Sequence, residues 1–165
     1  MKSSMHYLLA AAMGGALSAG LLAQGIQYDK IEIKTEKVSP NLYMLSGSEN
    51  VDPGHPDGAG GRIGILAGPD GIFMVDSQYA QITDKVLAAI KKIDPGPIRF
   101  MVNTHVHADH TAGNANFAKL GVVLLAREEL REGLARPNAL ARGAGTDPAR
   151  LPVITSCRSG IPAAR

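Results

Sequence analysis

The segment His105–His110 constrains this chain more than any other, because it gathers three of the five histidines and one aspartate into six consecutive residues. The residues before it alternate between apolar and polar side chains after a Pro-Gly-Pro breaker, which predicts a β-strand. The apolar positions of that strand are Ile98, Phe100 and Val102. If the strand runs to Thr104 or His105, the side chains of His105 and His107 point the same way, since residues two apart share a face. The sequence thus predicts two imidazoles that converge at the end of a strand.

Asp109 and His110 complete the cluster. A turn at Thr111–Asn114 leads into a helix-compatible run, Ala115–Leu120, which stops at Gly121. We therefore expect Asp109 and His110 to lie in a tight loop between strand and helix, where their side chains can turn back toward the strand end.

The cluster therefore offers two pairs of metal ligands. One divalent ion would take His105 and His107, and a second ion would take Asp109 and His110. Imidazole and carboxylate without thiolate favour zinc, with iron and manganese as alternatives. The other interpretation is that the histidines cap a strand or lie in a solvated loop. Three histidines with an aspartate in this register favour the metal site.

The pattern H-x-H-x-D-H, preceded by Asn103-Thr104 and followed by Thr111-Ala112-Gly113-Asn114, resembles the metallo-β-lactamase superfamily. Histidine at position 110, rather than arginine, is more similar to the glyoxalase II and B3-lactamase patterns than to the B1 pattern. The resemblance spans roughly Val38 to Leu134. It implies an α/β (α+β) fold, the four-layer αββα sandwich, with only its N-terminal half present.

The resemblance also implies a zinc-dependent hydrolase, with two ions in a complete family member. A metal-bound hydroxide would attack the carbonyl of a small-molecule substrate such as a β-lactam, a lactone or a thioester. His105 and His107 would hold the first ion, and Asp109 and His110 the second. Asp109 would be the catalytic residue that steers the water and its proton.

Asp76 follows the predicted strand Ile72–Val75 and matches a family position that accepts hydrogen bonds from the histidine loop. Alternatively, it is a helix N-cap or turn residue. Redox chemistry of the kind found in di-iron relatives is disfavoured, because their H-x-E-x-D-H motif has glutamate where this chain has His107.

The ligand set is incomplete by the family's standard. No histidine follows His110, and Asp147, the one later aspartate, lies in a turn sequence. Two ligands per ion are fewer than the three of a catalytic zinc site. The alternative function is therefore a truncated, catalytically inactive metal-binding fragment or pseudo-enzyme, whose missing ligands are lost by truncation or frameshift, or are supplied by another chain.

The two ends differ in composition from the middle. Residues 1–23 have a basic start, an apolar run and a small residue near Ala23, which predicts a signal peptide and export to the periplasm or the medium. A membrane anchor is the alternative, but the run is short and diluted by Gly and Ser, so we expect no stable membrane span after cleavage. Residues 24–150 form the expected domain. Residues 151–165 are expected to be an irregular tail, with the homologous sequence ending near Leu151–Thr155.

The rest of the predicted domain is a hairpin, further strands and two helices. The expected strands are Ile31–Val38, Leu42–Leu45, Arg62–Ala67, Ile72–Val75 and Val122–Ala126. Thr83 is expected to cap a helix that Pro95 ends, and Glu128–Leu134 begins another. His55, a lone histidine in the loop Glu49–Gly61, is left outside the site.

Composition excludes some classes of function. At 165 residues and 45% hydrophobic, the chain suits one domain. A formal charge of +2 with scattered Lys and Arg, and no Trp, argues against nucleic acid as a partner. Cys157 is the single cysteine, so no internal disulfide can form.

Overall fold

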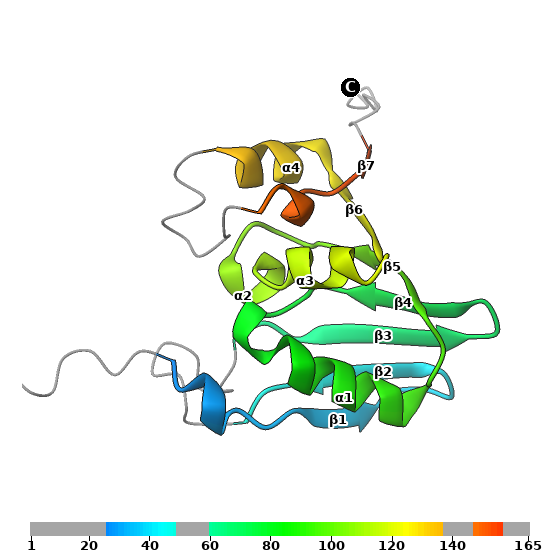
Figure 1. Cartoon of the computed structure of the whole chain (residues 1–165). Coiled ribbons are helices and arrows are strands. Elements are labelled where there is room, and N and C mark those ends of the chain that lie inside the picture. The colour runs from blue at the N-terminus through cyan, green and yellow to red at the C-terminus, as the bar shows by residue number, and fades with distance from the viewer. Residues whose placement is uncertain (1–25, 49–59, 137–146, 157–165) are drawn as a thin grey trace, which may run out of the picture.

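The computed structural model describes residues 26–48, 60–136 and 147–156 (Figure 1). The predicted signal peptide at residues 1–23, together with His55 and Cys157, lies outside the described residues. The described strands form one sheet in sequence order: β1 (Lys34–Lys37), β2 (Leu42–Ser46), β3 (Ile63–Gly68), β4 (Gly71–Val75), β5 (Ile98–Val102), β6 (Val123–Arg127) and β7 (Ile154–Ser156). The helices are α1 (Thr83–Ile93), α2 (Ala108–Thr111), α3 (Asn114–Lys119) and α4 (Glu128–Ala135), with single turns η1 (Tyr28–Lys30), η2 (Ala80–Ile82) and η4 (Pro148–Arg150).

The sheet changes from antiparallel to parallel at β4. Strands β1 to β4 pair as antiparallel neighbours, whereas β4 to β7 pair in parallel. Helix α1 connects β4 to β5, α2 and α3 connect β5 to β6, and α4 lies between β6 and β7. The predicted hairpin and crossover helix are therefore confirmed, and the carboxyl ends of β4 and β5 meet at one edge.

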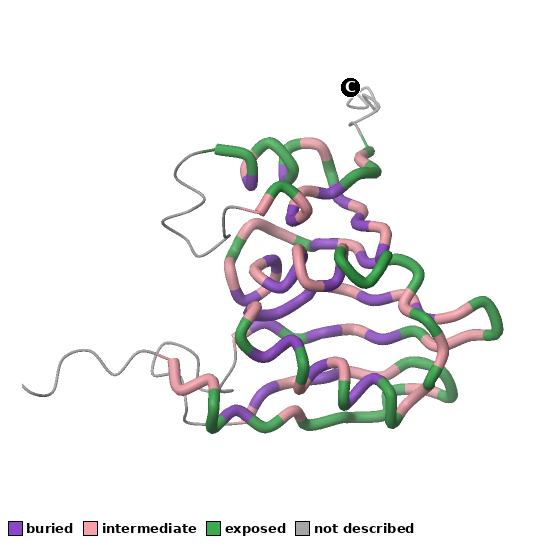
Figure 2. The backbone as a smooth tube through the Cα atoms, viewed as in Figure 1, coloured by how far each residue is buried: buried purple, intermediate pink, exposed green. Residues whose placement is uncertain are grey.

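The hydrophobic core lies between the sheet and the helices. Ile65, Met74 and Met101 on the central strands are 0% exposed. They belong to one buried cluster with Val86 and Ile90 of α1 and Phe117 of α3. Each such side chain contributes about 1.5–3 kcal/mol by its burial. Figure 2 shows this buried layer running through the sheet and the helix faces that cover it.

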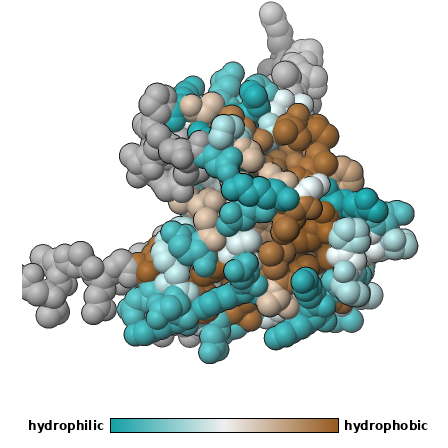
Figure 3. All heavy atoms as spheres, in the orientation of Figure 1, coloured by the Kyte–Doolittle hydropathy of each residue, from teal (hydrophilic) through white to brown (hydrophobic). Residues whose placement is uncertain are grey.

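The helix-bearing face is not fully closed. A cleft of 190 Å³ opens between α1, the start of β5 and the segment that joins α3 to β6, with Leu87, Ile90, Leu120 and Val122 among its lining residues. Figure 3 shows hydrophobic side chains at the surface of this face.

The opposite face of the sheet is apolar and carries no helix within the described residues. Residues in register across five strands form an apolar row on it: Leu42, Leu66, Phe73, Phe100 and Val123. Phe100 is 43% exposed and Leu66 44% exposed. One helix layer on one sheet is half of an αββα sandwich, so the predicted α/β fold is confirmed in its partial form (Figure 1).

The structure corrects two expectations near the histidines. Strand β5 ends at Val102, not at Thr104 or His105, because the Thr104 amide donates to Asp76 Oδ1 at 2.8 Å and so leaves the ladder. Asp109 and His110 lie in the short helix α2 and not in a loop. The amides of His110 and Thr111 both donate to the His107 carbonyl, at 3.0 and 3.1 Å, and so close that turn.

Two further expectations differ from the structure. Thr83 is the first residue of α1 and Ile82 is its N-cap, since the Thr83 hydroxyl donates back to the Ala80 carbonyl at 3.0 Å. The segment expected to be irregular contains β7, which pairs in parallel with β6. No helix in the described ranges has the length and apolar character needed to cross a bilayer.

Candidate metal centre

The predicted site residues lie at the edge where β4 and β5 end. Asp76 follows β4 directly, and the segment from Asn103 to His110 follows β5. The two strands are parallel neighbours, and the Asp76 amide donates to the Val102 carbonyl at 2.9 Å. The crevice beyond the carboxyl ends of parallel strands is where α/β sheets usually bind ligands.

Asp76 is the buried anchor of this edge. It is 2% exposed and adopts a left-handed backbone with φ of 62°, which costs a non-glycine residue about 1 kcal/mol or more. Its Oδ1 accepts from the Thr104 amide at 2.8 Å, and its Oδ2 accepts from the Thr104 hydroxyl at 2.6 Å and from His110 Nδ1 at 2.7 Å. Three hydrogen bonds to one carboxylate hold the strained conformation in place.

The bond to Asp76 decides which nitrogen His110 presents. With the proton on Nδ1, Nε2 of the neutral ring carries the lone pair. That Nε2 lies 3.4 Å from Asp109 Oδ2. Burial lowers the pKa of His110, but the hydrogen bond and charge of Asp76, with the charge of Asp109, outweigh it, and the net pKa is raised.

Thr104 links Asp76 to His105 through hydrogen bonds of its hydroxyl group. The Thr104 hydroxyl gives its one proton to Asp76, so it accepts from His105 Nδ1, which lies 3.0 Å away. Nε2 of His105 is then the lone-pair nitrogen, and it lies 3.1 Å from His107 Nδ1. Burial, followed by the nearby His110 and His107 rings, lowers the pKa of His105. A lowered pKa favours the neutral imidazole that binds metals.

These distances fit shared ions. Two nitrogens on a tetrahedral zinc with bonds near 2.0–2.1 Å lie about 3.3 Å apart, close to the 3.1 Å between His105 Nε2 and His107 Nδ1. The 3.4 Å between Asp109 and His110 is long for a hydrogen bond, whose usual length is about 2.9 Å, but suits two ligands of one ion. The His105 and His110 rings lie only 3.9 Å apart between centroids, so the two pairs are neighbours.

Each ion would nevertheless receive only a pair of ligands. Within residues 26–48, 60–136 and 147–156, no group of three or more His, Cys, Asp and Glu side chains is placed to hold one ion. Asp147, the later aspartate, instead caps η4 by accepting from the Ala149 amide at 2.9 Å. It also pairs with Lys119 at 2.7 Å.

A buried amide pair supports the site, and sequence reasoning missed it. Asn114 Nδ2 donates to Asn103 Oδ1 at 2.8 Å, and Asn103 Nδ2 donates to Asn114 Oδ1 at 3.1 Å. Asn114 also donates to the Arg150 carbonyl at 2.9 Å, and Ser77 Oγ donates to Asn114 Oδ1 at 2.9 Å. We expected Asn114 to be a turn residue, and its sequence neighbours carry no signal of this contact.

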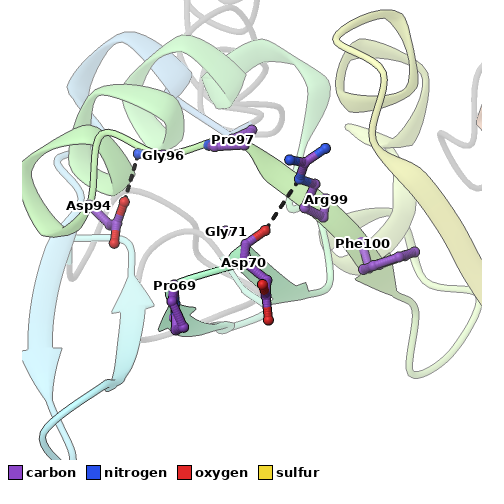
Figure 4. Close-up of a pocket in the computed structure, with 9 residues that line it drawn as sticks. Pro69, Asp70, Gly71, Asp94, Gly96, Pro97, Arg99 and Phe100 are labelled. Atoms are coloured by element: carbon purple, nitrogen blue, oxygen red, sulfur yellow. Dashed lines mark hydrogen bonds between the residues drawn. The ribbon is translucent and has the colours of Figure 1, made fainter.

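A second hollow lies at the other end of the sheet. Its volume is 680 Å³, and its lining comes from the β3–β4 turn and from the segment that leads into β5. Figure 4 shows Arg99 donating from Nε to the Asp70 carbonyl, at 3.2 Å, and Asp94 bound to the Gly96 amide, at 2.6 Å. The length of β5 separates this hollow from the histidines, so it is not the metal centre.

Comparisons with known proteins bear on the family and the fold of the chain. The family model described as metallo-beta-lactamase superfamily matches residues 56–163, well over half of the chain. The match extends past Leu151–Thr155, where we expected the homologous sequence to end. No curated protein matches the chain.

Several solved structures similar to this chain are described as metallo-beta-lactamases. A B3 enzyme with an active-site glutamic acid shares 26% identity over 61% of this chain and 35% of its own, with a TM-score of 0.50. An enzyme from Hirschia baltica shares 25% identity over 68% of this chain and 48% of its own, with a TM-score of 0.51. FIM-1 from Pseudomonas aeruginosa, in a mono-zinc form, shares 18% identity over 76% of this chain and 50% of its own, with a TM-score of 0.56. The chain thus spans half or less of the length of these proteins.

Proposed function

The chain belongs to the metallo-beta-lactamase superfamily, and on that premise we propose that it carries the metal-binding part of a zinc-dependent hydrolase. The substrate class is a small molecule with a reactive carbonyl, such as a β-lactam, a lactone or a thioester. The observation that supports this best is the geometry of the two ligand pairs, at 3.1 Å between His105 and His107 and 3.4 Å between Asp109 and His110.

Each residue of the proposed site has a separate role. His105 and His107 hold one ion, and Asp109 and His110 hold a second. Zinc, when bound, lowers the pKa of water and polarises a carbonyl group; iron and manganese suit the same ligands. Asp109, 8% exposed beside His110, is placed to orient a water and accept its proton. Asp76 keeps Nε2 of His110 directed toward the ion, and the same carboxylate acts on His105 through Thr104.

The second candidate function is a catalytically inactive metal-binding fragment. It is favoured by one observation: within the described part of the chain, no three ligands gather around one point. In that case the missing ligand comes from another chain or is never supplied, and zinc binds without turnover. We also propose that the protein is exported, on the composition of residues 1–23 alone.

Zinc binding and hydrolysis, measured on the same preparations, separate these possibilities. The full chain and the variants His105→Ala and Asp109→Ala are loaded with zinc, freed of excess metal and measured by mass spectrometry. Each is then assayed against a chromogenic cephalosporin, a lactone and a thioester. Asp84→Ala, which removes a carboxylate from the exposed first turn of α1, is the matched control.

The hydrolase proposal expects bound zinc and turnover of one substrate class in the full chain and in Asp84→Ala, and loss of turnover in the other two variants. Bound zinc without turnover supports the inactive fragment. A full chain that retains no zinc refutes both functions.

A further inference from the structure

The three residues after β4 bond to two different segments: Asp76 and Ser77 bond to His110, and Gln78 bonds to Gly61. Asp76 bonds to the His110 ring, and the Ser77 amide donates to the His110 carbonyl at 2.8 Å. Gln78, 2% exposed, donates from Nε2 to the carbonyl of Gly61. Gln78 has a left-handed φ of 61°, as Asp76 does, so the backbone is held in an unusual shape at both positions.

The segment that Gln78 holds lies directly against the second pair of ligands. A Cβ on Gly60 would lie 2.6 Å from Asp109 Oδ2. A Cβ on Gly61 would lie 2.5 Å from the Asp109 carbonyl, 2.7 Å from His110 Cε1 and 2.8 Å from His110 Nε2. These are distances that real Cβ atoms do not adopt, so only glycine allows the backbone to approach so closely. The Gly61 backbone therefore lies close to the Cε1 and Nε2 atoms of the His110 ring.

We infer that Gln78 is a positioning residue that holds the Gly60–Gly61 backbone against Asp109 and His110 and thereby fixes the second ligand pair. The Gln78 amide is well placed for this. Its Oε1 accepts from the Tyr79 amide at 3.3 Å while Nε2 donates to Gly61. The Gln78 carbonyl accepts from the Gly113 amide at 2.8 Å, next to α3. One residue therefore ties the glycine segment, the end of β4 and the start of α3 together.

The geometry on the ligand side follows from that tie. His110 is hydrogen-bonded to Asp76 at Nδ1, and the Gly61 backbone lies close to its Cε1 and Nε2 atoms. Asp109 is covered by both glycines. If the glycine backbone moves away, the Asp109 carboxylate gains room to rotate and its distance from His110 Nε2 is no longer defined. The inference about metal affinity rests on the proposed function, whereas the inference that Gln78 holds the Gly60–Gly61 backbone does not.

The test uses the full chain with Gln78→Met, which keeps the length of the side chain and removes its donor. Gln81→Met is the matched control, because Gln81 is exposed in η2, close to Gln78 in sequence. The first readout is metal-free: amide signals of Gly60, Gly61, Asp109 and His110 in ¹H–¹⁵N spectra recorded with a chelator. The second is the zinc dissociation constant by competition, together with the absorption spectrum of the cobalt-loaded protein.

We expect Gln78→Met to keep its far-ultraviolet circular dichroism, to shift or broaden those four signals, and to weaken zinc binding by about 10-fold or more. Gln81→Met should change neither readout. Wild-type positions for the four signals in Gln78→Met would overturn the inference whatever the zinc affinity. If Gln78→Met perturbs the four signals but the wild-type protein binds no zinc, the contact between Gln78 and Gly61 is supported and the proposed function is refuted.

A second variant covers the case in which Gln78→Met does not fold. Gly61→Ala retains Gln78 and presses a methyl group onto Asp109 and His110, so it should perturb the signals of those two residues and alter the cobalt spectrum. If Gly61→Ala leaves the Asp109 and His110 signals unchanged, the glycine segment does not contact the ligands and the inference is wrong.

Discussion

Asp76→Asn isolates the contribution of one carboxylate to the fold and to the histidines. The amide keeps the shape of the side chain and can still accept from the Thr104 amide. It cannot accept at the position of Oδ2, where the Thr104 hydroxyl donates at 2.6 Å and His110 Nδ1 donates at 2.7 Å. The variant therefore loses two hydrogen bonds to an ionised group and leaves two donors facing an amide nitrogen.

The expected loss of stability follows from those two bonds. A hydrogen bond to a charged group contributes about 1.5–3 kcal/mol. The His110 side chain is 18% exposed and Thr104 is exposed, so we take the lower end for each. Asparagine tolerates a left-handed backbone well, so no further strain is added. The free energy of unfolding should fall by about 3 kcal/mol.

Urea unfolding in the presence of a chelator measures this loss. Asp84→Asn, at an exposed acidic position on α1, is the control, and its change should stay within about 0.5 kcal/mol. The pKa of His110 should also fall in Asp76→Asn, because the effect of burial is then opposed only by Asp109, and a histidine proton titration by NMR reports it. A loss of less than about 1 kcal/mol with an unchanged His110 titration would refute the role given to Asp76.

Two further predictions concern groups that support the site from a distance. Asn114→Ala removes the donor to Asn103 Oδ1 and to the Arg150 carbonyl. The free energy of unfolding should fall by about 2–4 kcal/mol, and an unchanged urea midpoint would contradict the amide pair. The hydrogen bond from Lys119 holds the pKa of the Asp147 carboxyl below its ordinary value. The ion pair therefore stabilises the fold above the pKa that Asp147 has in the unfolded chain, and this stabilisation is lost as the pH falls through its pKa in the folded protein. The difference in thermal midpoint between wild type and Asp147→Asn should therefore shrink on acidification, and a constant difference would rule out the ion pair.

Local patterns predicted the elements that pack and missed the contacts that shape the site. The alternation at Ile98–Val102 and the apolar stripe after Thr83 reflect burial on one face, and a face can be identified from sequence spacing. The end of β5 cannot be identified from spacing, because Thr104 leaves the ladder to bind Asp76, 28 positions away in the sequence. Helix α2, which carries Asp109 and His110, has only 4 residues, too few to show a helical period in the sequence. The tie between Gln78 and Gly61 joins two polar positions that look like loop residues in the sequence.

The position of Asp76 explains why His105 and His110, one from each ligand pair, both present the lone pair of Nε2. A histidine can carry its proton on either nitrogen, so two rings placed at random would present matching nitrogens only in some combinations. Here one carboxylate accepts from His110 Nδ1 directly and from the Thr104 hydroxyl, which in turn accepts from His105 Nδ1. Both rings therefore keep Nε2 as the ligand atom, although they belong to different pairs. Because a single anion sets both tautomers, its removal should affect the two ligand pairs together, whereas the loss of Gln78 should affect only the pair formed by Asp109 and His110.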